Sequence, residues 1–174
     1  MFLVLGRPRS RTAWVANLLT VPPASHCLHE GLADVGANLL RLRDRLSEFP
    51  EGGDADTGLI HHLDEMLSAF PTARLVVMTG NDASWKQWCS RMGVQGSVRR
   101  KVQADYDRAC LILRGRAHFA DCREITTDPR AAFALWAHCF PGRPFDRERW
   151  EVLKDLNIQV IPESLLRRLR CSGL

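Results

Sequence analysis

Short apolar segments alternate along this chain with longer segments of helical pattern, and that alternation most limits its fold. Runs rich in apolar residues predict strands at residues 1–5, 24–30, 73–78 and 122–125. Apolar residues that recur every three or four positions predict helices at residues 14–19, 34–46, 56–70, 83–92, 98–113, 127–139 and 147–156. Strands and helices in alternation favour three α/β/α layers built around a mainly parallel sheet. We therefore expect an α/β protein of this type.

The remaining segments are predicted to connect or extend this pattern. Residues 49–54 contain a proline and two glycines and predict a loop. Residues 158–161 predict a final strand or an extended tail. A length of 174 residues is typical of a single domain with its own core, here residues 1–174.

Composition and charge exclude several classes of protein. An apolar content of 45% and a charged content of 25% are ordinary for a soluble globular chain. The net charge of +4 suits an anionic ligand but does not by itself indicate nucleic acid. The six cysteines form no CxxC or CxxH pair, so no metal site is expected. Because no signal peptide or membrane-spanning segment is recognisable, we expect a cytoplasmic location and no membrane partner.

The turn after the first predicted strand carries the strongest functional signal. Residues 6–14 read Gly-Arg-Pro-Arg-Ser-Arg-Thr-Ala-Trp and join that strand to the first predicted helix. A strand that turns directly into a helix directs free backbone N–H groups, and the positive end of the helix dipole, at one point. Such a point binds anions, most often phosphate, and the arginines at positions 7, 9 and 11 add positive charge.

The Walker A loop of ATP- and GTP-hydrolysing proteins does not match this turn. That loop requires Gly-x-x-x-x-Gly-Lys-Ser/Thr. Counting from Gly6 places Arg11, Thr12 and Ala13 at its second glycine, its lysine and its hydroxyl residue. Without the lysine and the magnesium-binding hydroxyl, ordinary nucleotide hydrolysis is not expected.

Residues 8–14 instead resemble the phosphate loop of the sulfotransferases that use 3′-phosphoadenylyl sulfate (PAPS), whose pattern is P-[KR]-S-G-[TS]-[TS]-[WL]. The resemblance implies a P-loop NTPase-like, sulfotransferase-like fold with PAPS as the nucleotide cofactor. Arg9 would contact the 5′-phosphate and bridging oxygen, and Trp14 would lie near the adenine. The cofactor-binding residues implied in this way are Arg7, Pro8, Arg9, Ser10, Arg11, Thr12, Ala13 and Trp14. Here Arg11 replaces a glycine and Ala13 replaces a hydroxyl residue.

A later stretch resembles the same family, whereas one element of the family pattern is missing. Residues 122–133 are similar to its late strand, loop and D-P-x-x-x-[LF] helix, and residues 140–146 to its F-L-G-L-P-F-D ending. In the family, an Arg after the third strand and a Ser further along bind the 3′-phosphate. Residues 79–84 supply no such Arg, and Lys86 or Gln87 falls at the Ser position. The resemblance therefore implies contacts to the 5′ end of PAPS, whereas the family's Arg and Ser that bind the 3′-phosphate have no match here.

His29 and Glu30, at the end of the second predicted strand, are the candidate catalytic bases, with Arg9 as the catalytic cation. Sulfuryl transfer needs a base for the acceptor's proton and cations for the charge on the moving group. In a parallel sheet, residues 6–12, 27–30 and 79–84 would converge at the carboxyl ends of the strands. Because neighbouring strand residues point to opposite faces, only one of the two bases is expected to face the ligand, with Glu30 favoured.

Structural interpretations of the same residues stay open at this point. The arginines would also suit a solvated turn, and the His-Glu pair a surface or capping role. Trp85 and Trp88, three residues apart, are predicted to pack in the core rather than to form a platform for base stacking. Three functions remain: a sulfotransferase acting on a hydroxyl or amine, a divergent P-loop nucleotide-binding protein with kinase-like transferase activity, and a non-catalytic phosphate-binding module. The short chain leaves the acceptor to an open cleft or to a second subunit of a homo-oligomer.

Overall fold

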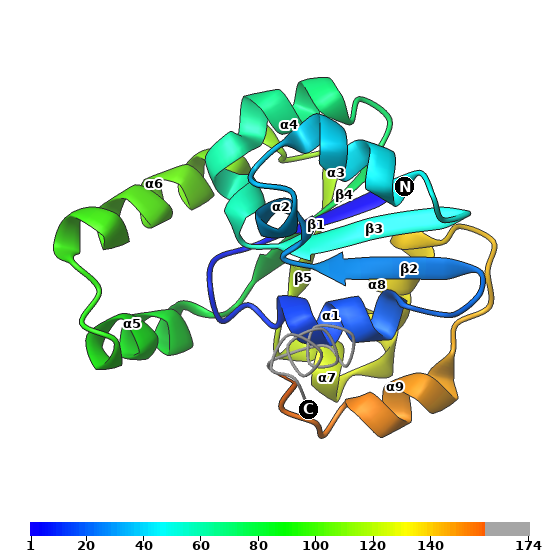
Figure 1. Ribbon diagram of the computed structural model, residues 1–174. Coiled ribbons are helices and arrows are strands. Elements are labelled where there is room, and N and C mark those ends of the chain that lie inside the picture. Colours follow the sequence, from blue (N-terminus) through cyan, green and yellow to red (C-terminus); the bar gives the residue numbers. More distant parts are fainter. Residues whose placement is uncertain (159–174) are drawn as a thin grey trace, which may run out of the picture.

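A five-stranded parallel sheet lies between two layers of helices in the computed structural model, which describes residues 1–158 (Figure 1). The strand order is β2-β3-β1-β4-β5, and every pairing is parallel. The strands are β1 (Phe2–Leu5), β2 (Ser25–His29), β3 (Glu51–Asp56), β4 (Arg74–Thr79) and β5 (Ala117–Asp121). The expected α/β class, with three layers and a parallel sheet, is confirmed.

Alternate residues of the central strand β1 supply two separate cores. Phe2 and Val4 pack with α1, α8 and α9 on one face, and Leu3 and Leu5 pack with α3, α4 and α6 on the other. All four residues are fully buried, as expected for a strand covered on both faces. The helices are α1 (Thr12–Leu19), α2 (Gly31–Asp34), α3 (Leu39–Leu46), the 3₁₀ helix η1 (Gly58–His62), α4 (Leu63–Ala69), α5 (Asp82–Arg91), α6 (Gly96–Ile112), α7 (Glu124–Thr127), α8 (Pro129–Cys139) and α9 (Arg147–Leu153).

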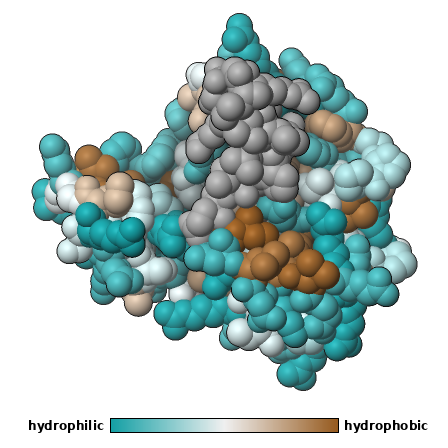
Figure 2. Space-filling view, turned by 60° about the horizontal axis from the view of Figure 1, so that its bottom comes forward, coloured by the Kyte–Doolittle hydropathy of each residue, from teal (hydrophilic) through white to brown (hydrophobic). Residues whose placement is uncertain are grey.

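The surface is more polar than these apolar cores. The face seen in Figure 2 is mostly hydrophilic, and its hydrophobic residues gather mainly toward the lower centre of the view. Among residues 1–158, no helix has both the length and the apolar character needed to cross a bilayer.

Strand β3 corrects the prediction of a loop at residues 49–54. Its sequence, Glu-Gly-Gly-Asp-Ala-Asp, lacks an apolar run, yet five of its six residues are buried. The two glycines are required by close neighbours: a Cβ on Gly52 would overlap the backbone oxygen of Leu46, and one on Gly53 would overlap the ring of Phe2. Apolar periodicity could not identify this strand because backbone proximity, rather than side-chain burial, selects its residues.

The predicted strand at residues 122–125 is also wrong. The edge strand is β5, five residues earlier, and residues 124–127 form the short helix α7. Asp121 ends the strand and its Oδ1 accepts hydrogen bonds from the backbone N–H groups of Arg123 and Glu124. This carboxylate therefore satisfies backbone N–H groups at the start of α7, and the part of the family resemblance that assigned a strand here is corrected.

Smaller corrections concern element boundaries. Of the helix predicted at residues 34–46, only residues 39–46 form a helix, α3, because α2 ends at Asp34 and Gly36 and Ala37 then adopt left-handed φ values of 65° and 59°. Asn38 then caps α3 through its side-chain oxygen. The cap predicted at Asp128 is confirmed, since it accepts from the N–H of Arg130. Of the final strand predicted at residues 158–161, all but Ile158 lies outside the described residues.

The sheet topology fixes where a ligand can meet several loops at once. The chain passes from β1 to β2 on one side of β1 and later reaches β4 on the other side. The loop after β1 consequently lies between the carboxyl ends of β3 and β4, its neighbours in the sheet. In open α/β sheets this reversal of direction is where ligands bind.

Candidate functional site

A cavity of about 290 Å³ opens at the carboxyl ends of the strands, beside the loop that follows β1. Its volume approaches the lower end of the range typical of small-molecule sites. Segments that are far apart in sequence form its wall: Arg9, Arg11, Thr12, Ala13, His29, Glu30, Ser84, Cys122, Arg123, Asn157 and Ile158. The expected convergence of the loops after β1, β2 and β4 is therefore present.

The backbone of the loop presents donors to this cavity. Arg9 and Arg11 have φ values of 74° and 62°, a left-handed conformation that bends the chain sharply into α1. The first backbone hydrogen bond of α1 runs from Val15 N to Arg11 O. Within the described part of the chain, the N–H groups of Thr12 and Ala13 have no acceptor, so they remain available to an anion in the cavity.

Positive charge predominates around the cavity. Among the described residues that line it, Arg9, Arg11 and Arg123 carry positive charge and Glu30 carries the one carboxylate. Among residues 1–158, neither Arg11 nor Arg123 forms a side-chain ion pair. Guanidinium groups with backbone N–H donors beside them form a suitable site for a phosphate or sulfate group.

Both candidate bases reach the cavity, because the chain turns at Glu30. Strand β2 ends at His29, and Glu30 follows with a left-handed φ of 57°, which breaks the strand's alternation. His29 Nε2 lies 3.2 Å from the hydroxyl oxygen of Thr12. Burial lowers the pKa of His29, opposed by the negative charges of Glu30 and Asp56. A lowered pKa favours the neutral imidazole, the form that accepts a proton.

Two buried carboxyl groups on β3 support this turn from behind. Asp54 Oδ1 accepts a hydrogen bond from Gly31 N, and Asp56 Oδ2 accepts one from Leu32 N, each at 3.0 Å. Burial is the largest cause raising the pKa of both carboxyl groups. They anchor the start of α2 and thereby fix the position of Glu30. Within residues 1–158, no group of three His, Cys, Asp or Glu residues is arranged to hold a metal ion.

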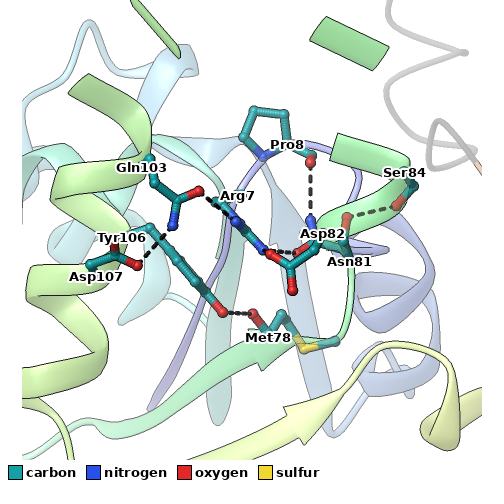
Figure 3. Close-up of polar contacts among 9 residues, drawn as sticks. All are labelled: Arg7, Pro8, Met78, Asn81, Asp82, Ser84, Gln103, Tyr106 and Asp107. Carbon is teal, nitrogen blue, oxygen red and sulfur yellow. Dashed lines mark hydrogen bonds and ion pairs between the residues drawn. The ribbon is translucent and has the colours of Figure 1, made fainter. Parts of the chain in front are cut away.

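Arg7, predicted to bind the cofactor, does not line the cavity and lies instead in a polar network (Figure 3). Its guanidinium donates to Gln103 Oε1 at 2.6 Å, to Asn81 Oδ1 at 2.9 Å and to Asp82 Oδ1 at 2.5 Å. The same group lies 4.3 Å from the centre of the Tyr106 ring. Asn81 returns a hydrogen bond to the carbonyl of Pro8, so Arg7 and Pro8 join the loop to α5 and α6.

Replacing Arg7 by methionine is expected to reduce the free energy of unfolding by about 1–3 kcal/mol, because buried Asn81 Oδ1 loses its donor. Urea denaturation of the variant and of Arg41→Ala, an exposed arginine on α3, measures the difference. Arg41→Ala should be indistinguishable from the wild type. If the Arg7 variant instead unfolds like the wild type but binds anions more weakly, Arg7 contacts the ligand and does not stabilise the fold.

Two further predicted cofactor residues are buried and do not line the cavity. Trp14 is fully buried, and its indole N–H donates to the carbonyl of Leu153 at 2.7 Å. This position corrects the expectation that Trp14 lies near an adenine. Ser10 is also fully buried, with its hydroxyl close to Gly6, where a Cβ would overlap it. Both residues shape the loop rather than line the cavity.

Sequence reasoning did not identify several residues of the wall. Cys122 and Arg123 were assigned to a strand, although their place directly after β5 puts them at the same sheet edge as the other loops. Burial raises the pKa of Cys122, so its thiol is not poised as a nucleophile. Asn157 and Ile158 lie far along the chain, and nothing in the sequence pattern connects them with the loop.

Comparison with known proteins adds no family to this geometry. A scan against protein-family models finds no match, and a search of curated proteins finds none either.

Proposed function

We propose that the cavity binds the 5′-phosphosulfate of PAPS and that the protein is a cytoplasmic enzyme transferring the sulfuryl group to a hydroxyl or amine acceptor. One observation carries the proposal: a single cavity brings together Arg11, the N–H groups at the start of α1, which have no acceptor among residues 1–158, and His29, whose pKa is lowered by burial. The resemblance of residues 8–14 to the sulfotransferase loop indicates that the anion is a phosphosulfate.

In this proposal the loop binds the anion and His29 accepts the proton of the acceptor. The acceptor oxygen or nitrogen forms a bond to sulfur as the bond between sulfur and the phosphate oxygen breaks. The phosphate leaves with the electron pair of that bond, and Arg9, Arg11 and the N–H groups of α1 stabilise its charge. His29 Nε2 takes the proton of the acceptor, and Glu30 stabilises the imidazolium that forms.

Removing the charge of Arg11 tests the anion site without damaging the loop. Glycine adopts a φ of 62° freely, so Arg11→Gly should unfold within about 1 kcal/mol of the wild type. Its affinity for adenosine 3′,5′-bisphosphate should fall by roughly 10- to 150-fold, as expected for loss of a hydrogen bond from a charged group. Titration calorimetry measures the affinity, and thermal unfolding measures the stability.

The control is Arg41→Ala, which removes one positive charge from an exposed position on α3. It should bind the bisphosphate as the wild type does. Absence of binding by the wild type to adenosine 3′,5′-bisphosphate, PAPS and sulfate would refute the anion site. Magnesium-dependent ATP binding in preference to these ligands would favour the kinase-like alternative. Binding without any release of adenosine 3′,5′-bisphosphate from PAPS, across a panel of hydroxyl and amine acceptors, would favour the non-catalytic module.

A further inference from the structure

A second groove adjoins the first cavity and lies along helix α5. Its volume is about 360 Å³, and its wall consists of Arg9, Ser84, Gln87, Trp88, Arg91, Met92 and Asn157. Arg9, Ser84 and Asn157 also line the first cavity. Because the two spaces share these residues, a molecule that fills the first cavity can extend into the second.

One face of α5 forms most of the groove. Ser84, Gln87, Trp88 and Arg91 follow one another at intervals of three, one and three residues, the spacing that brings side chains to one side of a helix. His29 and Glu30 line the first cavity but not this groove. The two adjoining spaces therefore have two ends, one beside the candidate bases His29 and Glu30 and the other along α5.

Trp88 gives the groove a rigid aromatic wall. Its ring stacks on that of Trp85, with centroids 5.5 Å apart and an angle of 21° between the planes. Trp85 is 2% exposed and belongs to the core, whereas Trp88 is partly exposed and lines the groove. Trp85 occupies one face of the Trp88 ring and holds it in place, so a third ring could continue the stack from the groove side.

The neighbours of Trp88 suit a flat, polarisable group. Arg91 supplies a guanidinium that can lie over an aromatic ring, and Met92, 61% exposed, supplies a soft thioether. Gln87 adds both a hydrogen-bond donor and an acceptor. Together these groups recognise the face and edge of a heteroaromatic ring.

We propose that this groove binds the planar ring of the ligand whose anionic group occupies the first cavity. The proposal rests on the proposed function, because it needs an anion in that cavity. The ligand class is an anion joined to a heteroaromatic ring, as in a nucleotide, with the ring on Trp88 and the junction beside Arg9 and Ser84. Trp88 is then a determinant of specificity, and the acceptor enters from the side of His29 and Glu30.

The test compares adenosine 3′,5′-bisphosphate with ribose 3,5-bisphosphate, which carries the same phosphates without the base. Titration calorimetry should show the adenosine compound binding the wild type roughly 5- to 150-fold more tightly, the range expected for stacking of one base. Trp88→Ala should lose that advantage while its affinity for ribose 3,5-bisphosphate stays unchanged. Trp88→Phe should retain most of it. Phe133→Ala, which removes an aromatic residue 52% exposed on α8, should alter neither affinity.

The outcomes separate this proposal from the one on which it rests. Equal affinity of the wild type for the two compounds would overturn the ring site and leave the anion site standing. A preference for the adenosine compound that persists in Trp88→Ala would also overturn it, because the base would then bind elsewhere. Failure of both compounds to bind would overturn the anion site and the ring site together.

Discussion

Replacing Trp14 by alanine is expected to reduce the free energy of unfolding by about 3–5 kcal/mol, the range for removing a buried tryptophan side chain. The indole fills the core between α1, the sheet and α9, and its N–H satisfies the carbonyl of Leu153. Trp14→Phe keeps much of the packing but leaves that carbonyl unpaired, so it should lie between the wild type and the alanine variant. Urea denaturation followed by circular dichroism measures all three.

The matched comparison is Trp88→Ala, which removes the same side chain from a partly exposed position on α5. Its cost in stability should be clearly smaller, because less apolar surface returns to water. If Trp14→Ala unfolds like the wild type but loses affinity for adenosine 3′,5′-bisphosphate, the assignment of Trp14 to the core is wrong. The two tryptophans therefore separate a packing role from a ligand-binding role.

Replacing Gly53 by alanine is expected to cost about 3 kcal/mol or more, at or beyond the upper end of the usual range for overpacking. The added methyl group would overlap three ring carbons of Phe2. That ring is fully buried and packs edge-on against Phe140, with centroids 5.3 Å apart, so it has little freedom to move. Thermal and urea denaturation measure the loss.

Gly96 provides the control for this substitution. It is the first residue of α6, and the nearest atom to an added Cβ is Arg100 Nη1, at 3.5 Å. Gly96→Ala should be neutral or stabilising by up to about 1 kcal/mol. Combining Gly53→Ala with Phe2→Leu should recover part of the loss, because a smaller side chain makes room for the methyl group. A single Gly53→Ala variant as stable as the wild type would contradict the described packing of β3 on β1.

The parts of the fold that were predicted correctly are those in which local sequence and tertiary environment favour the same structure. Strand β4 is a continuous apolar run in the middle of the sheet, and α8 begins with an Asp cap followed by proline. Strand β3 was missed because its glycines are required by close contacts with residues from other parts of the chain. Its aspartates are buried to cap α2, a need that no local pattern reveals.

The candidate site was predictable to a similar extent. The turn into α1 identified Arg9, Arg11 and Thr12, because a strand–turn–helix junction has the same chemistry wherever it occurs. Arg7 has the same charge as these arginines, yet its direction depends on Gln103 and Asn81, far along the chain. Trp88 was predicted to pack in the core, and only the packing of α5 distinguishes it from the buried Trp85.

The buried carboxyl group of Asp54 makes folding a proton-uptake reaction. Its pKa is raised well above the ordinary value, chiefly by burial. Between the ordinary pKa and the raised one, the folded chain retains a proton that the unfolded chain releases. The stability contributed by this group is complete below the ordinary pKa and is lost as the pH rises through the raised one. Exposed Asp82 behaves in the opposite way, because its bond with Arg7 lowers its pKa, and that contribution is lost as the pH falls. Acidification therefore weakens the attachment of the loop to α5, while it removes the unfavourable buried charge of Asp54 beside α2.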